Sequence, residues 1–248
     1  MEFASPLKTG LFRRRFKRFF AEIEVDGKII TAHVPNTGSL KGCLREGARC
    51  LYSTSDDPER KLAYSLMALE VDGTWVGVNT HLANDIVAEA IIGGALPKLK
   101  KWDSFQREVK INAQTRLDFA LWRASKTLPH QAKISLHNFA SERFHFIEVK
   151  NVTWAENSMA LFPDAVTTRG QKHLEELIAL HEQGHTAEIL FLVQRKDCRQ
   201  FRPADEVDPA YGKLLRQAVK AAVKISAYPC AFDEKKVELI PKPLALEL

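Results

Sequence analysis

The chain has 248 residues, a formal net charge of +5 and 45% hydrophobic residues, which is typical of a globular protein with one large domain or two smaller ones. No stretch is apolar enough for a membrane-spanning helix, and the N-terminus has no signal-peptide core. The four cysteines contain no Cys-x-x-Cys pair, which argues against a zinc site and for reduced thiols. We therefore expect a cytoplasmic protein without a membrane partner.

The basic residues are unevenly distributed along the chain. Residues 1–20 contain six Lys and Arg and one acidic residue, so they carry the whole net charge of +5. The remaining residues are neutral on balance. A basic segment of this kind favours a partner that carries phosphate groups.

Short strands separated by turns dominate the first third of the chain. Residues 19–26 alternate between apolar and polar side chains, Asp26-Gly27 is a tight-turn signal, and residues 28–34 form the returning strand. Residues 47–53 and 74–78 supply further strands. About five short strands in such a segment predict a small closed barrel, and we expect one of the OB type over residues 1–82.

A run of cations and aromatic rings, Arg13-Arg14-Arg15-Phe16-Lys17-Arg18-Phe19-Phe20, lies at the start of this barrel. Cations that meet phosphates and rings that stack on bases are typical of a platform for single-stranded nucleic acid. We therefore predict DNA contacts at Arg13, Arg14, Arg15, Lys17 and Arg18. The alternative is that the phenylalanines fill the barrel core and the arginines face solvent.

Helices and strands alternate in the rest of the chain, which predicts a mixed α/β domain over residues 83–248. The expected elements are a helix over 85–92 capped by Asn84, strands over 105–111, 115–122 and 143–152, a helix over 170–183, a strand over 187–193, a helix over 209–226 and a last strand from 237. The first two strands form an antiparallel hairpin, and the later strand–helix–strand sequence implies a parallel crossover. Residues 123–142 are expected to form an extended loop or an added hairpin.

Charged side chains interrupt two of the apolar strands. Glu148 and Lys150 share one face of the central strand, and Asp118 lies in an otherwise apolar strand. Buried charges cost free energy unless they pair or serve a ligand, and a structural ion pair is the plain alternative. If the two carboxylates are adjacent, a cation between them offsets their repulsion, and Mg²⁺ or Mn²⁺ suits such oxygen ligands. Lys150 would then orient a water for in-line attack on phosphorus.

Further side chains are candidates for the same site. Glu89 lies between apolar positions of the first helix, where it is either a solvated glutamate or an additional carboxylate for the metal. Gln194 ends the apolar strand over 187–193 and could position substrate or water. The N-terminus of the helix over 170–183 attracts anions through its free N–H groups and dipole, although ordinary helix-end charge is the alternative. The side chains expected to approach the substrate there are Arg169, Lys172 and His173.

Blocks of sequence spread along the chain resemble the sugar fermentation stimulation protein (SfsA) family. They are Met1-Glu2-Phe3, Pro6-Leu7, TAHVPNTGS over 31–39, VGVNT over 76–80, EVKNVT over 148–153, FPDAVT over 162–167, RGQKHL over 169–174 and VQR over 193–195. Asp118 followed by Glu148-x-Lys150 also resembles the motif of the PD-(D/E)xK nuclease superfamily. The resemblance implies an OB-like barrel, a nuclease-like C-terminal domain, non-specific DNA binding and a regulatory role in sugar metabolism, notably maltose use.

Two hypotheses follow from these residues. In the first, the protein binds DNA and keeps a metal-dependent phosphodiesterase site, in which Asp118, Glu148 and the carbonyl of Val149 bind Mg²⁺ or Mn²⁺. In the second, the nuclease-like domain is only a scaffold, and the protein is an inactive DNA-binding regulator. The intact set of Asp118, Glu148 and Lys150 favours the first hypothesis. The sequence leaves the oligomeric state open, a homodimer included.

Overall fold

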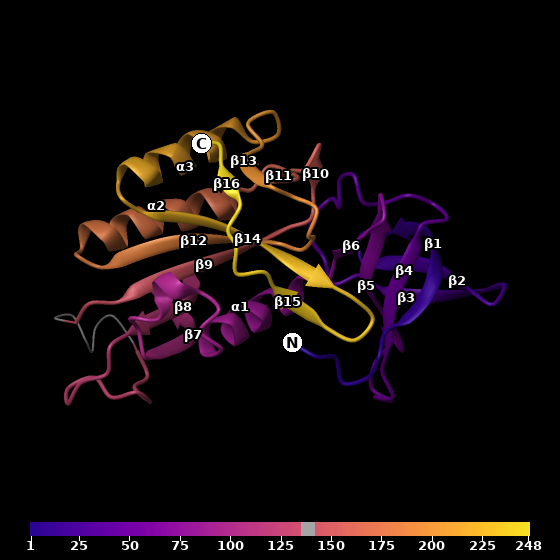
Figure 1. Ribbon diagram of the computed structural model, residues 1–248, viewed down its shortest axis with the longest axis horizontal. Helices are drawn as coiled ribbons and strands as arrows, with labels where there is room; N and C mark the ends of the chain where they lie inside the picture. Colours follow the sequence, from indigo (N-terminus) through magenta and orange to yellow (C-terminus); the bar gives the residue numbers. More distant parts are fainter. Residues whose placement is uncertain (135–141) are drawn as a thin grey trace.

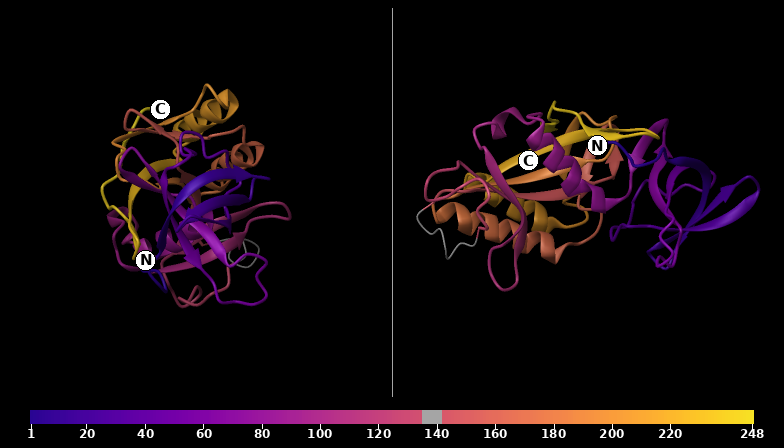
Figure 2. Two further views of the ribbon diagram at one scale, coloured as in Figure 1. Left: turned by 90° about the vertical axis from the view of Figure 1, so that its right-hand side faces the viewer. Right: turned by 90° about the horizontal axis from the view of Figure 1, so that it is seen from below.

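The computed structural model describes residues 1–134 and 142–248. A β-barrel and a larger α/β domain lie side by side, as Figures 1 and 2 show. The expected combination of a small barrel followed by a mixed α/β domain is therefore confirmed.

The barrel contains the strands β1 (Lys8–Phe16), β2 (Phe20–Val25), β3 (Lys28–His33), β4 (Arg49–Thr54), β5 (Tyr64–Val71) and β6 (Thr74–Gly77). The strand order is β3-β2-β1-β4-β5-β6, and an additional pairing of β3 with β5 closes five of the strands into a barrel. Phe12, Ile23 and Leu66 fill its core. The strands β1 and β5 were not predicted. The basic run at the end of β1 was interpreted as a surface platform, and the apolar run of β5 does not alternate with polar residues.

The α/β domain is built on a six-stranded sheet of order β15-β14-β12-β9-β8-β7. Its strands are β7 (Ser104–Lys110), β8 (Arg116–Trp122), β9 (His145–Val152), β12 (Thr186–Val193), β14 (Lys224–Phe232) and β15 (Val237–Leu239). The predicted hairpin of β7 and β8 is antiparallel, and β12 pairs in parallel with β9 and β14. Both predictions about strand direction are therefore confirmed.

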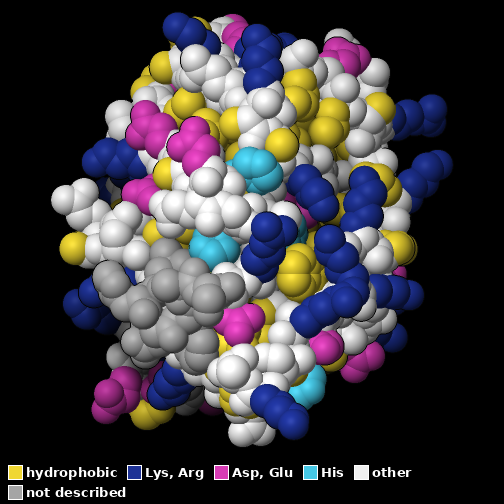
Figure 3. All heavy atoms as spheres, turned by 90° about the vertical axis from the view of Figure 1, so that its left-hand side faces the viewer, with side chains coloured by type: hydrophobic (Ala, Val, Ile, Leu, Met, Phe, Trp, Pro, Cys, Tyr) yellow, Lys and Arg dark blue, Asp and Glu magenta, His cyan; other side chains and the backbone are white. Residues whose placement is uncertain are grey.

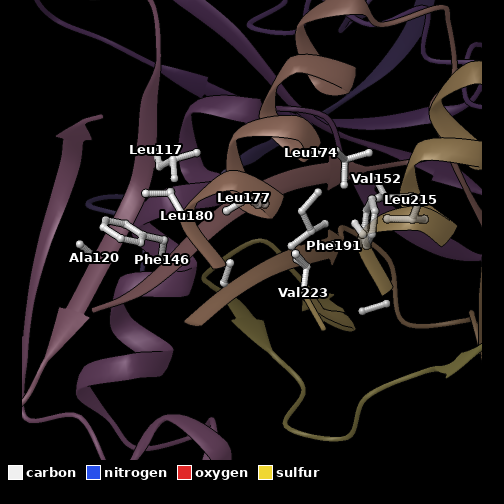
Figure 4. Packing of buried hydrophobic residues seen from close by; sticks show 14 of the residues in the cluster. Leu117, Ala120, Phe146, Val152, Leu174, Leu177, Leu180, Phe191, Leu215 and Val223 are labelled. Carbon is white, nitrogen blue, oxygen red and sulfur yellow. The ribbon is translucent and has the colours of Figure 1, made fainter. Parts of the chain in front are cut away.

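Helices cover both faces of this sheet. The helix α1 (Ala83–Ile92) packs on one face, and α2 (Thr168–Glu182) and α3 (Pro209–Lys220) pack on the other. Figure 4 shows leucines of α2 next to Phe146, Val152 and Phe191 of the sheet. The central strand β9 is thus covered on both sides, as its two apolar faces predict.

A second, small sheet lies beside the start of α2. It consists of β10 (Ala155–Glu156), β11 (Met159–Phe162), β13 (Gln200–Pro203) and β16 (Ala245–Leu246). The segment over 157–169 was expected to be a loop, but β11 pairs in parallel with β13. The short 3-10 helices Thr80–Leu82 and Pro97–Leu99 flank α1.

The predicted helix over 209–226 is wrong in its second half. The helix α3 ends at Lys220, because Ala222 adopts a positive φ of 62° and Lys224 already begins β14. The β-branched Val223 and Ile225 favour the strand. Asn84 also does not cap a helix, since it lies inside α1. Of the predicted insertion over 123–142, residues 135–141 lie outside the described residues, and the others contain no helix or strand.

The first seven residues connect the two parts of the molecule. Phe3 N–H donates to the carbonyl of Lys235, and Leu7 N–H donates to the carbonyl of Glu234, so this segment runs beside β15. At the barrel, Gly77 N–H donates to the carbonyl of Gln194. The domain boundary after residue 82 stays a prediction.

None of the helices in the described ranges is long and apolar enough to cross a membrane. All four cysteines belong to those ranges, are buried and form no disulfide.

Figure 3 shows many Lys and Arg side chains along one side of the face opposite the barrel. The basic surface is therefore not confined to the N-terminal run.

Candidate metal and phosphate site

Asp118 and Glu148 face each other where β8 and β9 diverge. The ladder between the two strands runs from the pair Leu121–His145 to Phe119–Ile147, so the next pair is Asp118 and Glu148. The two oxygens of Asp118 have separate partners. Val149 N–H donates to Oδ2 at 2.7 Å, and the side-chain amide of Asn84 donates to Oδ1 at 2.7 Å.

Burial and the charge of Glu148 raise the pKa of Asp118 to about 7. Three contacts lower the pKa of Asp118, namely the hydrogen bonds from Val149 and Asn84 and the charge of Lys150. They do not offset the effects of burial and of Glu148. Two adjacent carboxylates cannot both ionise freely in a buried place. In the absence of a cation, Asp118 is therefore the member of the pair that holds a proton near neutral pH.

Glu148 keeps its charge because two basic side chains contact it. Burial raises its pKa, but the ammonium of Lys150 and the imidazole of His173 outweigh burial, and the pKa of Glu148 is lowered. Lys150 Nζ donates to Glu148 Oε1 at 2.7 Å, and His173 Nδ1 contacts the same oxygen. The other oxygen, Glu148 Oε2, is buried and has no hydrogen-bond partner among the described residues. It is free to accept a cation.

These groups line a cavity of about 360 Å³. Glu148 and His173 are 4% and 6% exposed, so they lie at the buried end of the cavity, whereas His81 and Arg169 are exposed at its edge. Arg169, at the start of α2, brings a further cation to it. The lining residues are Thr80, His81, Ala83, Asn84, Asp118, Glu148, Val149, Lys150, Asn151, Arg169 and His173.

The donor set fits a hard divalent cation. Within residues 1–134 and 142–248, no group of three or more His, Cys, Asp and Glu side chains could hold a metal ion. The site instead offers Asp118, Glu148 and the peptide of Val149. The N–H of Val149 points at Asp118, and the carbonyl of the same strand residue points to the same side. Two carboxylates and a carbonyl, completed by water, are typical ligands of Mg²⁺.

Two predicted site residues lie elsewhere. Glu89 is 58% exposed, forms an ion pair of 2.6 Å with the amino group of Met1 and lines a different cavity beside Glu238. Packing against the sheet turns Asn84 of the same helix towards Asp118 instead. Glu89 is therefore not brought to the carboxylate pair.

Gln194 is fully buried and does not line the cavity that contains Asp118 and Glu148. Its side-chain amide donates to Asn151 Oδ1 at 2.7 Å. Asn151 does line that cavity. Gln194 can therefore orient Asn151, but it cannot contact a substrate or water in the cavity directly.

The basic run of β1 is largely occupied by contacts within the barrel. Arg13 pairs with Glu24, and Arg14 pairs with Glu22 at 2.6 Å. Arg15 donates to the carbonyls of Asn36 and Gly38, Arg18 donates to that of Thr37, and Lys17 is in the turn after β1. Phe16 and Phe20 stack on each other at 5.5 Å. The cations are partly neutralised, which weakens the predicted phosphate platform.

The three side chains predicted at the start of α2 lie at or beside the carboxylate pair, unlike the basic run of β1. Arg169 and His173 line the cavity at the carboxylate pair, and Lys172 lines the adjoining one. His173 is buried against Glu148, so it is part of the carboxylate cluster rather than a free DNA contact. Sequence reasoning missed Asn84, which was interpreted as a cap, and Asn151, which directly follows Lys150.

Comparison with known proteins agrees with this architecture. Residues 14–78 match the family described as "SfsA N-terminal OB domain", and residues 81–236 match "Sugar fermentation stimulation protein RE domain". A sugar fermentation stimulation protein homolog of Bdellovibrio bacteriovorus is 48% identical over 258 residues, with 100% of both chains covered. The homolog of Geobacter sulfurreducens is 41% identical over 235 residues, with 94% of each chain covered.

A solved structure is similar over the whole length. The structure of Pyrococcus furiosus SfsA in complex with Ca²⁺ superposes with a TM-score of 0.83 at 26% identity, and the match covers 100% of this chain and 98% of that one. The barrel is therefore of the OB type, as expected. On its sequence and on its fold, the chain belongs to the SfsA family of sugar fermentation stimulation proteins.

Proposed function

We propose that the protein is a DNA-binding phosphodiesterase that depends on Mg²⁺ or Mn²⁺. The observation that carries the proposal is the carboxylate pair of Asp118 and Glu148 next to Lys150 in one cavity, with Glu148 Oε2 buried and unpartnered among the described residues. The Ca²⁺ complex of the Pyrococcus relative supports a divalent cation in this family. Asp118, Glu148 and the carbonyl of Val149 are the proposed ligands.

The reaction is the hydrolysis of a phosphodiester. A water oxygen forms a bond to phosphorus, the bond from phosphorus to one ester oxygen breaks, and that oxygen leaves with a proton as a hydroxyl group. When bound, the divalent cation supplies positive charge that stabilises the extra negative charge of the transition state. Lys150 adds a second positive charge and orients the attacking water.

The remaining residues of the cavity hold these groups in place. His173 contacts Glu148 and fixes the orientation of its carboxylate. Asn84 and the Val149 N–H do the same for Asp118. Arg169 lies where it can neutralise a phosphate next to the one that reacts. Pre-positioned groups of this kind are the main source of catalysis in phosphoryl chemistry.

Calorimetry and a cleavage assay test this proposal. We expect the purified protein to bind Mg²⁺ or Mn²⁺ and to cleave labelled single-stranded, duplex or branched DNA only when the metal is present. A wild-type protein that takes up neither metal contradicts the catalytic proposal.

A second function is favoured by one specific observation. Lys150 and His173 both contact Glu148 Oε1, so the charge of this carboxylate is already compensated within the chain. Such a self-neutralised cluster is also what an inactive DNA-binding regulator of sugar metabolism, maltose use included, would contain. Metal binding without cleavage of any DNA tested would favour this function.

Salt dependence locates the phosphate contacts. We expect Arg169→Ala and Lys172→Ala each to reduce the slope of log affinity against log salt by about 1, because each removes one phosphate contact. Arg14→Ala is the matched control, since Arg14 is exposed but already paired with Glu22. If Arg14→Ala lowers the slope as much, the DNA footprint lies on the basic run of the barrel.

A further inference from the structure

Three cavities adjoin one another across the candidate site. The cavity at the carboxylate pair shares Arg169 and His173 with one of about 630 Å³ next to the turn between β7 and β8. It shares Thr80 and Asn151 with a cavity of about 320 Å³ between the barrel and the α/β domain. The site therefore lies between the other two cavities.

A wall of contacts borders the cavity between the domains. Ser39 Oγ and Leu40 N–H both donate to Asp164 Oδ2 at 3.0 Å, which joins the barrel loop to the loop before α2. Lys41, which follows Leu40, makes a further contact between the two domains, because its Nζ lies 3.7 Å from the centre of the Trp154 ring.

The contacts of Asp164 and Trp154 lie away from the place where the cavity between the domains meets the cavity at the carboxylate pair, which we call the central cavity. Thr80 and Asn151 line both cavities, whereas Asp164 and Trp154 line the cavity between the domains but not the central one. The barrel also contacts the α/β domain further along the same loop, since Cys43 Sγ lies 3.7 Å from the carbonyl of Thr153. A strand that enters from the central cavity would meet these contacts on one side of the cavity between the domains.

The lining suits one nucleotide. The exposed Val166 and the half-buried Phe162 supply apolar surface for a base, and Thr37 and Thr167 supply polar groups. Arg18 also lines the cavity and contributes a cation for a phosphate. A volume of about 320 Å³ is at the lower end of the range for small-ligand sites. Such a volume suits a single nucleotide better than a duplex.

We propose that the cavity between the domains holds the terminal nucleotide of a single DNA strand. This inference rests on the proposed function, because it places the adjacent phosphodiester at Asp118, Glu148 and Lys150. The rest of the strand leaves past Lys172, along the cavity at the β7–β8 turn. The substrate class is thus a single strand with a free end. Hydrolysis of its last linkage joins a water oxygen to phosphorus, breaks one ester bond and releases one nucleotide.

A binding experiment tests the free-end requirement without cleavage. A fluorescent linear single strand is bound in EDTA and displaced by unlabelled linear or circular strands of the same sequence. We expect the linear competitor to be at least about tenfold more effective, a difference of about 1.4 kcal/mol. Equal competition by the circle overturns the proposal.

Variants that fill the cavity give a second readout. Ala165 and Thr37 are exposed and line it from the two domains, so Ala165→Trp and Thr37→Trp should each remove the preference for linear strands. Ala4→Trp is the matched control, because Ala4 is exposed and lines none of the three cavities. An unchanged preference in both cavity variants, with folding verified by circular dichroism, contradicts the proposal.

A cleavage arm separates this inference from the proposed function. With Mn²⁺, linear strands labelled at either end should lose nucleotides from one end, and circular single strands should stay intact. Cleavage of circles as fast as linear strands overturns the inference and leaves the phosphodiesterase standing. A preference for linear strands in binding, without cleavage of any DNA, supports the end pocket and contradicts the phosphodiesterase.

Discussion

Replacing Lys150 with Ala is expected to lower the rate of DNA cleavage by about 10²–10³-fold while metal binding persists. Lys150 Nζ donates to Glu148 Oε1 at 2.7 Å, and its side chain is 12% exposed on the cavity wall. An ammonium in this position acts chiefly on the charge that develops in the transition state, so its loss lowers kcat more than it raises KM. Single-turnover kinetics measure the rate, and calorimetry measures the metal affinity.

Lys172→Ala is the matched control for this prediction. It removes the same charge from the adjoining cavity, where Lys172 is exposed and does not contact Glu148. We expect Lys172→Ala to weaken DNA binding and to leave kcat close to that of the wild type. A Lys150→Ala protein that is folded, binds metal and cleaves within a few-fold of the wild-type rate would remove Lys150 from the mechanism.

The elements with a clear period could be predicted from the sequence. The alternating strand over 19–26, the hairpin of β7 and β8 and the helix α2 are local patterns, and each forms close to the expected residues. The pairing of β3 with β5, which closes the barrel, joins residues far apart in sequence. No local pattern encodes such a pairing, and the apolar run of β5 has no alternation to mark it as a strand.

The site was predictable where a polar side chain interrupts an apolar strand. Asp118, Glu148 and Lys150 are such exceptions, and the register of β8 and β9 brings the first two opposite each other. The side chains of helix α1 were not predictable in the same way, whereas Arg169 and His173 at the start of α2 line the cavity. The rotation of α1 is set by its packing on the sheet, and it turns Asn84 to Asp118 and Glu89 to the amino group of Met1.

Replacing Asp118 with Asn is expected to stabilise the metal-free protein at pH 8. The pKa of Asp118 is raised from 3.8 to about 7 in the folded state. Between pH 3.8 and pH 7, the folded protein therefore keeps a proton on Asp118 that the unfolded chain has already released. The free energy of unfolding of the wild type therefore falls as pH rises from about 4 to 7, and it stays lower above 7. Asn carries no charge and avoids this loss.

The effect can be measured by urea unfolding in EDTA. Each unit of pKa shift corresponds to about 1.4 kcal/mol, so the advantage of Asp118→Asn over the wild type should grow by roughly 2.5 kcal/mol between pH 5 and pH 8. The hydrogen bonds can persist, because the side-chain carbonyl of the introduced asparagine can accept from Val149 N–H and its amide can donate to a rotated Asn84. An advantage that does not change with pH would contradict a protonated Asp118.

Glu148→Gln is the matched control, and its effect should have the opposite sign. The pKa of Glu148 is lowered in the folded state by Lys150 and His173 against burial, so its stabilising effect is present above about pH 4.5 and is lost as pH falls. Removing that charge leaves Lys150 without its anionic partner and should destabilise the metal-free protein at pH 8. Loss of either carboxylate should still weaken Mg²⁺ or Mn²⁺ binding by at least about 100-fold, since even residues that only orient metal ligands contribute 10- to 100-fold. Opposite effects on stability together with the same loss of metal binding would distinguish a carboxylate pair built for a cation from a structural ion pair.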